Sequence, residues 1–370
     1  MEYFIIPAAT LLALLSFANG ANDVSKAIAT LAGARVTSMR KAVLWGTIWT
    51  LAGSLSGLYL GAAIIKNITQ NVYLIPPDFS FAMASAIGLA PALWVGLATW
   101  RKWPVSTTHA VVGGLLGAGV AALGAHGIAW SATLQNIALP LLVSPFLAIG
   151  FAYLFSPALE NAAAKLQRVR VCVSPMPKFV LIRAGNAGGT AALQDCVVCD
   201  QDSMEAAIAP NFGLSVDHMH WLTSGVLSFS RGLNDTPKLI AVILPFLIAG
   251  NVAQESLHWM FMISAFAMAA GGLLVGSRIT EILGFRVTAL DHSQGFCANV
   301  VAAVLVLFAS KLGLPVSTTH VSACSIMGVG ISGGRGIDKR TVSSMLFAWL
   351  VTVPAAALFA TLIYKGALVL

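Results

Sequence analysis

The chain has 370 residues, of which 58% are hydrophobic and only 9% are charged, and its formal net charge is +7. Soluble domains carry about a quarter charged residues, so this composition excludes a water-soluble globule and indicates that the solvent is lipid. The apolar segments run past strand length and predict helices rather than a β-barrel. The basic residues lie in loops without interleaved aromatic residues, so we expect no nucleic-acid partner.

Ten apolar segments follow one another along the chain. The first five run over 3–33, 42–65, 79–100, 104–124 and 130–156, and the second five over 218–250, 257–283, 288–312, 315–333 and 341–365. The first lacks a basic n-region and leads directly into a polar motif, so we interpret it as a mature helix. We therefore predict an all-α membrane protein with a first transmembrane repeat (1–156), a cytoplasmic linker (157–217) and a second transmembrane repeat (218–370).

Two polar motifs inside the apolar segments each occur twice. The stretch 16–26, which contains Gly-Ala-Asn-Asp, returns in altered form at 228–238. Pro-Val-Ser-Thr-Thr-His at 104–109 returns letter for letter at 315–320. The separation from the Asp to the Pro is 81 residues in the first copy and 80 in the second. A duplication explains this spacing.

Loop charges predict the topology. If the N-terminus is outside, the inside loops hold 15 basic residues and the outside loops only Lys66 and Lys311, as the positive-inside rule requires. Both termini then lie outside, and an odd number of segments turns the second repeat upside down. Inverted-topology repeats with broken helices are typical of secondary transporters, whose sites lie near the bilayer midplane. We expect that architecture here, with about five segments in each repeat.

The depth of the Ser-Thr-Thr runs depends on the stretch 79–124. Two full crossings leave Ser106–Thr108 near a membrane surface, whereas a re-entrant hairpin with Pro104 near its tip brings them to the midplane. The hairpin also places Arg101 and Lys102 close to the tip, where an anion or water must compensate their charge. We favour the re-entrant hairpin and keep two full spans as the alternative.

The Asn-Asp pairs predict cation sites. A carboxylate within a span costs several kcal/mol unless it is paired or solvated. Gly20 and Gly232 permit a helix break, and opened carbonyls together with amide and carboxylate oxygens suit a hard cation such as Na⁺. The alternative is an internal ion pair in each copy, with Lys26 and Lys238, and proton carriage by Asp is a further variant. The candidate ligands are Asn22, Asp23, Asn234 and Asp235.

The Ser-Thr-Thr runs predict an anion site. One Ser or Thr suffices to cap a helix that starts after Pro, and three hydroxyls exceed that need. Backbone N–H groups, the positive helix end and the hydroxyls together suit an oxyanion, and the candidate ligands are Ser106, Thr107, Thr108, Ser317, Thr318 and Thr319. His109 and His320 follow directly, either donating to a neighbouring helix carbonyl or acting on the substrate or a proton.

The linker contains a Cys-x-x-Cys pair. Cys196 and Cys199, together with Cys172 and either His218 or His220, have ligand types that zinc accepts. A single Cys-x-x-Cys is a weak signal, so we favour free cytosolic thiols. The role of the linker stays open at this point.

At the duplicated motifs the chain resembles the inorganic phosphate transporter (PiT) family of sodium–phosphate symporters and their proton-coupled relatives. The resemblance covers both repeats, and Gly-Ala-Asn-Asp at 20–23 is that family's signature. It implies a homodimer that works by alternating access, with sodium held by the Asn-Asp pairs and phosphate held by the Ser-Thr-Thr runs. The family also includes sulfate carriers.

The second copy departs from the family pattern. It reads Gly-Leu-Asn-Asp-Thr-Pro at 232–237, and Arg231 stands where the first copy has Asn19. Arg231 is a candidate anion ligand or a partner for a nearby carboxylate. Phosphate keeps a proton near neutral pH, so a selective site should offer it an acceptor, whereas sulfate needs donors only.

We hypothesise a secondary active transporter of the cell inner (plasma) membrane that imports inorganic phosphate together with Na⁺ or H⁺. Apart from the coupling ion we expect no cofactor. A sulfate or other oxyanion permease and a passive anion channel are the alternatives, and the channel predicts no ion coupling. We do not expect an enzyme, because the sequence shows neither a nucleophile with its base nor a metal constellation.

Overall fold

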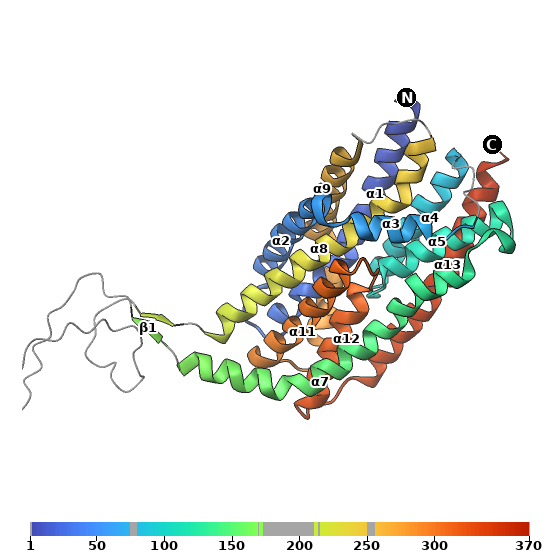
Figure 1. The fold of residues 1–370 in the computed structure, drawn as a ribbon. Helices are drawn as coiled ribbons and strands as arrows, with labels where there is room; N and C mark the ends of the chain where they lie inside the picture. The colour runs from blue at the N-terminus through green and yellow to red at the C-terminus, as the bar shows by residue number, and fades with distance from the viewer. Residues whose placement is uncertain are drawn as a thin grey trace, which may run out of the picture.

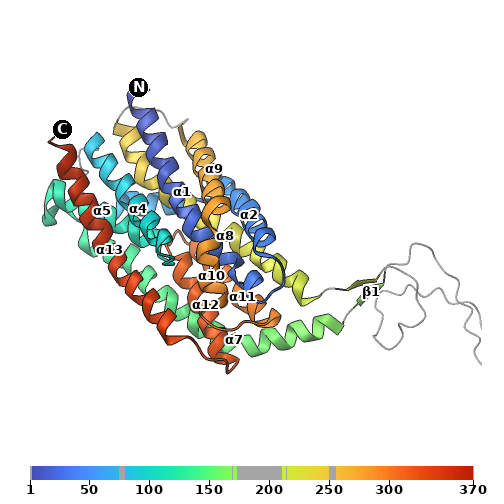
Figure 2. The ribbon, with the colours of Figure 1, turned by 180° about the vertical axis from the view of Figure 1, so that it is seen from behind.

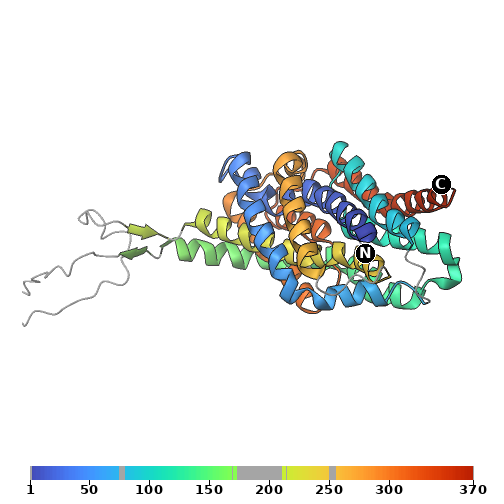
Figure 3. The same ribbon diagram turned by 90° about the horizontal axis from the view of Figure 1, so that it is seen from above.

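The computed structural model of the chain describes residues 2–74, 80–168, 170–172, 211–213, 215–249 and 256–369. Nearly all of these residues are helical, which confirms the predicted all-α class. The first helix begins and the last helix finishes at the same end of an elongated bundle. A small antiparallel pair of strands lies beyond the other end (Figure 1). Views from behind and from above agree (Figures 2 and 3).

The helices fall into two runs that follow the same order. The first run comprises α1 (Glu2–Gly33), α2 (Met39–Leu60), α3 (Ala62–Gln70), α4 (Phe81–Trp100), α5 (Thr107–Leu123), η1 (Ala125–Gly127), α6 (Trp130–Thr133), η2 (Leu134–Ala138) and α7 (Leu139–Arg168). The second run comprises α8 (Val216–Ala249), α9 (Ser256–Val275), α10 (Ser277–Phe285), α11 (His292–Lys311), α12 (Thr318–Ser332) and α13 (Lys339–Ala367). Strands β1 (Arg170–Cys172) and β2 (Asn211–Gly213) stand between the runs.

Seven stretches of the described residues are long and apolar enough to cross a membrane. They are Ile5–Gly33, Met39–Leu60, Phe81–Trp100, Trp130–Lys165, Leu257–Val275, His292–Lys311 and Lys339–Ala367. The long helix α8, which carries the second polar motif, is not among them. Many side chains on the outside of the bundle are large and apolar, as a lipid-facing surface requires.

The expected helix breaks at the Asn-Asp pairs are wrong. Helices α1 and α8 run unbroken through both pairs, and the interruptions fall between α2 and α3, between α9 and α10, and at the turns that join α4 to α5 and α11 to α12. The Asn and Asp side chains find partners on other helices, so no carbonyl of α1 or α8 has to be opened for them. The neighbouring glycines serve close helix packing instead.

Glycines bring pairs of helices into backbone contact. A Cβ on Gly20 of α1 would lie 2.0 Å from the Met268 carbonyl oxygen of α9, and one on Gly232 of α8 would lie 2.3 Å from the Thr50 carbonyl oxygen of α2. Gly117 of α5 meets α13, and Gly328 of α12 meets α7, in the same way. Each contact joins a helix of the first run to a helix of the second, so the two runs interlock.

The α4–α5 and α11–α12 pairs form two hairpins whose turns meet inside the bundle. The segment before the first hairpin pairs with the segment after it, since Leu74 N donates to Gly127 O (2.9 Å). At the turns, Thr319 Oγ1 donates to Val105 O (2.8 Å). Two hairpins that crossed the membrane fully from opposite sides would have turns about 30 Å apart. This contact agrees with two re-entrant hairpins that enter from opposite sides, while α4 and α11 are each long and apolar enough to cross a membrane.

Two apolar cores flank the turns. One contains Leu12 and Leu15 of α1 with side chains of α3, α4, α5 and the end of α8. The other contains the end of α1 and the start of α8 with side chains of α7, α10, α11 and α12. Each hairpin is thus embedded in its own core. The polar residues of α1 and α8 lie along those helices between the two cores, which positions them beside the turns.

Candidate ion and anion site

The first Asn-Asp pair lies beside a buried lysine. Lys26 Nζ donates to Asp23 Oδ1, to Val105 O (2.9 Å) and to Thr319 Oγ1. Thr107 Oγ1 donates to the other oxygen of the carboxylate, Asp23 Oδ2 (3.4 Å). All of these side chains are at most 3% exposed. The ammonium group therefore joins a carboxylate of α1 to both hairpin turns.

The second copy repeats this arrangement with the hairpins exchanged. Lys238 Nζ donates to Asp235 Oδ1 (3.2 Å), to Val316 O (2.6 Å) and to Thr108 Oγ1 (3.0 Å). Thr318 Oγ1 donates to Asp235 Oδ2 (3.4 Å). The internal ion pairs weighed as an alternative at the Asn-Asp motifs are therefore present in both copies.

The two asparagines anchor α1 and α8 to the hairpins through their nitrogens. Asn22 Nδ2 donates to Thr99 Oγ1 (2.8 Å) and to Trp103 O (3.1 Å), and Asn234 Nδ2 donates to Ser310 Oγ (2.8 Å). Both amide oxygens are buried, and neither has a hydrogen-bond partner among the described residues. Buried acceptors are normally satisfied, so each of these oxygens has an acceptor position left over.

Among the side chains that contact the two carboxylates, the copies differ at one position, four residues before the Asp. In the first copy Asn19 Nδ2 donates to Asp23 Oδ2 (3.1 Å). In the second, Arg231 Nη1 lies 3.7 Å from Asp235 Oδ2, and Arg231 Nη2 donates to Thr50 Oγ1 (2.6 Å). Arg231 thus acts as the partner of a carboxylate, one of the two roles weighed for it. With both lysines and both carboxylates ionised, the buried cluster has one surplus positive charge.

The serines cap the helices that start at the turns. Ser106 Oγ accepts from His109 N (3.2 Å) and Ser317 Oγ from His320 N (3.2 Å). His109 Nδ1 lies 2.8 Å from Ser106 Oγ. The two imidazole rings are in tilted contact, with centroids 4.6 Å apart and an interplanar angle of 48°, and the His320 ring is also in tilted contact with Trp349 (4.0 Å, 39°). Among the described residues, neither histidine ring makes the expected hydrogen bond to a helix carbonyl.

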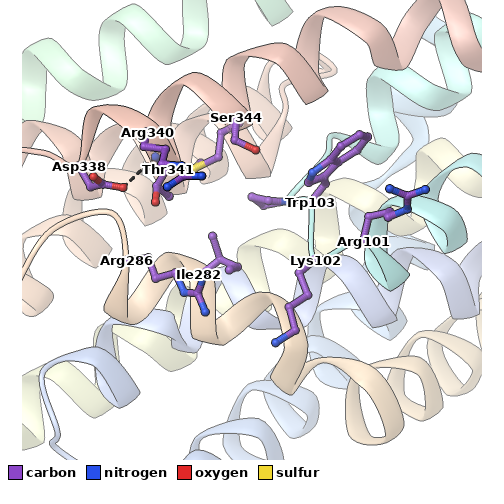
Figure 4. A pocket seen from close by; sticks show the side chains of 11 residues that line it. Arg101, Lys102, Trp103, Ile282, Arg286, Asp338, Arg340, Thr341 and Ser344 are labelled. Atoms are coloured by element: carbon purple, nitrogen blue, oxygen red, sulfur yellow. Dashed lines mark hydrogen bonds between the residues drawn. The ribbon is translucent and has the colours of Figure 1, made fainter.

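A basic cavity of about 680 Å³ lies next to the first turn. Figure 4 shows side chains of α13, of the end of α10 and of the first turn around it. Its lining residues are Arg101, Lys102, Trp103, Pro104, Ile282, Arg286, Asp338, Arg340, Thr341, Ser344 and Met345. The cavity reaches Pro104, which precedes the carbonyl that Lys26 contacts. It also explains how the two basic residues of the turn are solvated, because both are exposed there.

The structure brings the two predicted carboxylates into contact with threonines of the Ser-Thr-Thr runs, Asp23 with Thr107 and Asp235 with Thr318. The predicted asparagines contact Thr99, Trp103 and Ser310 instead, and the predicted serines contact the histidines that follow them. Sequence reasoning missed the Val105 and Val316 carbonyls, which accept from the lysines, and the Thr99 and Ser310 hydroxyls, which hold the asparagines. The duplication contains the signal for the hydroxyls. Thr99 and Ser310 lie five residues before the two Pro-Val-Ser-Thr-Thr-His motifs.

The proposed linker site falls mostly outside the described residues, which include neither Cys196 nor Cys199. Of the histidines considered for it, His218 contacts Ser215, and His220 is buried against Thr30 Oγ1 (2.9 Å). Among the described residues no three or more His, Cys, Asp or Glu side chains lie together in a way that could hold a metal ion. The zinc hypothesis for the linker thus stays a prediction, because its Cys-x-x-Cys pair lies outside the described residues.

A helical membrane bundle with two hairpin turns meeting at a buried charged cluster defines a membrane transporter. A model of the phosphate transporter family matches residues 19–360, and the chain belongs to that family. Relatives include a chloroplast inorganic phosphate transporter of Arabidopsis thaliana (29% identical, covering 93% of this chain and 68% of the relative) and a phosphate permease of Pyrococcus furiosus (26%, covering 96% and 94%).

The fold matches that of a solved structure, a sodium-dependent phosphate transporter, with a TM-score of 0.77. The two chains are 22% identical, and all of both is covered. The resemblance to phosphate transporters predicted from the motifs is thus confirmed. The family consists of transporters, so the prediction that the chain is not an enzyme is also confirmed.

Proposed function

We propose that the protein imports inorganic phosphate across a membrane by alternating access, driven by the coupled entry of a cation, Na⁺ or H⁺. The observation that carries the proposal is the meeting of two acidic Asn-Asp pairs and two hydroxyl-rich helix starts in one buried cluster. A cation and an oxyanion bound in such a cluster lower each other's desolvation cost.

The cation half of the proposed site consists of Asn22, Asp23, Asn234 and Asp235. Carboxylate and amide oxygens are ligands that hard cations accept, and the unpartnered amide oxygens support this role. Sodium is the first candidate for the coupling ion, because the structurally similar protein is sodium-dependent. A proton on one of the two carboxylates is the other candidate.

The anion half consists of the two Ser-Thr-Thr runs, Ser106–Thr108 and Ser317–Thr319. Both stand at helix starts, where the N–H groups and the helix dipole favour an anion. Their threonine hydroxyls contact either a carboxylate or a lysine. A carboxylate supplies the acceptor that a protonated phosphate requires only while it holds no Na⁺, so the choice between phosphate and sulfate is decided by the competition assay described below. Arg231, His109 and His320 are accessory candidates near this half.

We further propose that 1–156 and 218–370 are inverted repeats joined by a cytoplasmic linker (157–217), in a multi-pass protein of the inner (plasma) membrane. Lys26 and Lys238 make equivalent contacts with the hairpins exchanged, which supports the two-fold relation. The first helix begins and the last helix ends at the end of the bundle opposite β1 and β2, the described strands of the linker stretch (Figure 1). This agrees with external termini. We expect a homodimer, as the family resemblance implies.

The test is uptake by proteoliposomes of labelled phosphate, with sulfate and arsenate as competitors, each with and without a Na⁺ or pH gradient. We expect phosphate uptake that arsenate inhibits, that sulfate inhibits weakly, and that one of the two cation gradients drives. Strong inhibition by sulfate would indicate the oxyanion permease. Phosphate uptake that is indifferent to both gradients would contradict symport and indicate the passive channel.

A further inference from the structure

The two buried lysines connect the cation half of the proposed site to the anion half. Lys26 Nζ contacts the Asp23 carboxylate on one side and the Thr319 hydroxyl on the other. Lys238 does the same with Asp235 and Thr108. Each ammonium group therefore already touches a proposed cation ligand and a proposed phosphate ligand. The proposed function assigns the lysines no part.

Each ammonium occupies the place at its carboxylate that a coupling cation needs. Lys26 and Lys238 are 0% and 2% exposed, and the carboxylates are 1% and 3% exposed. At Asp23 the second oxygen is taken by Thr107 and Asn19. A cation that binds this carboxylate therefore competes with the ammonium for Asp23 Oδ1, the oxygen that has the ammonium as its contact.

A displaced ammonium needs a new anionic partner, because an unpaired charge in a buried site is strongly unfavourable. The hydroxyls that the lysines already contact are those proposed to bind phosphate. A phosphate at these hydroxyls lies within reach of the ammonium without a large movement of the side chain. The same phosphate supplies the negative charge that the ammonium loses when it leaves the Asp.

We propose that Lys26 and Lys238 couple cation entry to phosphate entry by exchanging partners. Without ligands each lysine neutralises its Asp. When phosphate and cations bind, each ammonium turns to the phosphate and each carboxylate takes a cation in its place, so every buried charge keeps a partner. This inference rests on the proposed function and names the residues that make its two ligands interdependent.

The exchange makes the coupling obligatory. A cation alone leaves an unpaired ammonium, and phosphate alone leaves an unpaired carboxylate, so either partial state is disfavoured by the cost of a buried charge. Binding linkage is reciprocal, so the factor by which the cation strengthens phosphate binding equals the factor by which phosphate strengthens cation binding. That factor is the quantity to measure.

The experiment titrates the purified, reconstituted full-length protein with radioactive phosphate at several Na⁺ concentrations, and with radioactive Na⁺ at several phosphate concentrations. The same titrations over pH, in the absence of Na⁺, cover proton coupling. For the wild type we expect a linkage factor of at least about tenfold with one of the two cations. The double variant Lys26→Met/Lys238→Met should reduce it to about one. It should bind the cation more tightly without phosphate than the wild type does.

Two further variants separate this effect from misfolding. Asp23→Asn/Lys26→Met removes a matched pair and leaves no unpaired charge, so it should fold, bind phosphate and retain the part of the linkage that Lys238 provides. Lys66→Met changes an exposed lysine outside the site and should leave both affinities and the linkage unchanged.

The proposal is overturned if the double lysine variant keeps the linkage factor of the wild type, or if its cation affinity without phosphate does not rise. It is likewise overturned if the wild type binds phosphate without linkage to either cation. A wild type that binds and transports no phosphate contradicts the proposed function itself. Coupled uptake that survives in the double lysine variant contradicts only the exchange.

Discussion

The two halves of the buried cluster have the same plan but different charges. In the first half one carboxylate, Asp23, faces one lysine and the neutral Asn19. In the second half Asp235 faces both Lys238 and Arg231. The first half is electrically balanced, whereas the second has a surplus positive charge. Duplication thus placed two similar motifs together, and a single substitution made one of them more attractive to an anion and less attractive to a cation.

The turns beside the two halves differ in a similar way. Lys102 of the first turn and Gly313 of the second occupy equivalent positions with positive φ, 58° and 69°. Lys102 binds Glu281 of α10 and lines the basic cavity. Gly313 O accepts from Asn67 of α3 (3.1 Å), and a Cβ on Gly313 would lie 2.8 Å from the Ala63 Cβ. One turn is charged and open, and the other is neutral and closely packed.

The largest effect is expected from removing each carboxylate in turn. Asp23→Asn leaves one unpaired cation, and Asp235→Asn leaves two, so we expect losses in the free energy of unfolding of roughly 3 and roughly 5 kcal/mol. Both variants should lose cation-coupled phosphate uptake. Thermal unfolding in detergent and uptake by proteoliposomes measure the two effects. Asp217→Asn at an exposed ion pair is the control, and a larger loss of stability for Asp23→Asn would contradict the asymmetry.

Arg231→Asn gives the second half the side chain found in the first. Since Arg231 lies 3.7 Å from the Asp235 carboxylate, its removal should raise cation affinity at that carboxylate by roughly tenfold and lower phosphate affinity. Calorimetric titration with NaCl and then with phosphate gives both values. The reverse variant, Asn19→Arg, should shift both affinities in the opposite directions. Equal cation affinities in Arg231→Asn and the wild type would show that the arginine charge is not felt at Asp235.

Removing the hydroxyls that the lysines contact should have a moderate effect. Thr319→Val deletes an acceptor of Lys26, and Thr108→Val deletes an acceptor of Lys238. Each variant also removes one hydrogen bond that the hydroxyl would donate to the phosphate anion, about 1.5–3 kcal/mol, so we expect phosphate affinity to fall by at least about tenfold. Equilibrium binding of labelled phosphate measures the change. Thr10→Val, at an exposed hydroxyl outside the site, should change nothing, and a similar loss in that variant would indicate a general effect of the substitution.

The smallest effect is expected at the first turn. Lys102→Gly relieves the positive-φ strain of a non-glycine residue, about 1–2 kcal/mol. It also loses an exposed ion pair and raises the entropy of the unfolded chain. The net change in the free energy of unfolding should therefore stay within about 1 kcal/mol. Denaturant titration in detergent measures it, and a loss of several kcal/mol would mean that Lys102 supports more than its partner Glu281.

The same ion pair predicts a weak pH dependence. Hydrogen bonds from Lys102 and Arg286 hold the pKa of the Glu281 carboxyl below its ordinary value. A depressed carboxyl pKa contributes stability above the unfolded-state pKa, and this stability is lost as the pH falls through the folded-state pKa. The Glu281 side chain is 41% exposed, so the contribution of this carboxyl to the free energy of unfolding is small. Glu281→Gln should remove this part of the acid dependence of the melting temperature.

Spacing and composition predicted much of the fold. Apolar runs located the helices. The duplicated motifs indicated which residues meet, because polar residues inside membrane-spanning segments need polar partners, and each motif can supply partners for the other. The predicted helix break was wrong. Gly20 permits a break but equally permits backbone contact with Met268, and only the neighbouring helix decides between these uses. The bridging role of Lys26 was also out of reach, since its partners Val105 and Thr319 lie on different hairpins.

The glycine contacts between helices divide the molecule into parts that we expect to move as units. Helices in backbone contact cannot slide past each other by a residue without a clash, so α1 should travel with α9 and α2 with α8. By the same argument, α5 should travel with α13 and α12 with α7. Lys26 reaches from the first of these bodies to turns that belong to the others. If these units separate from one another, the contacts of Lys26 lie between them. An opening of the site between the units therefore has to break the contacts of that ammonium with the two turns.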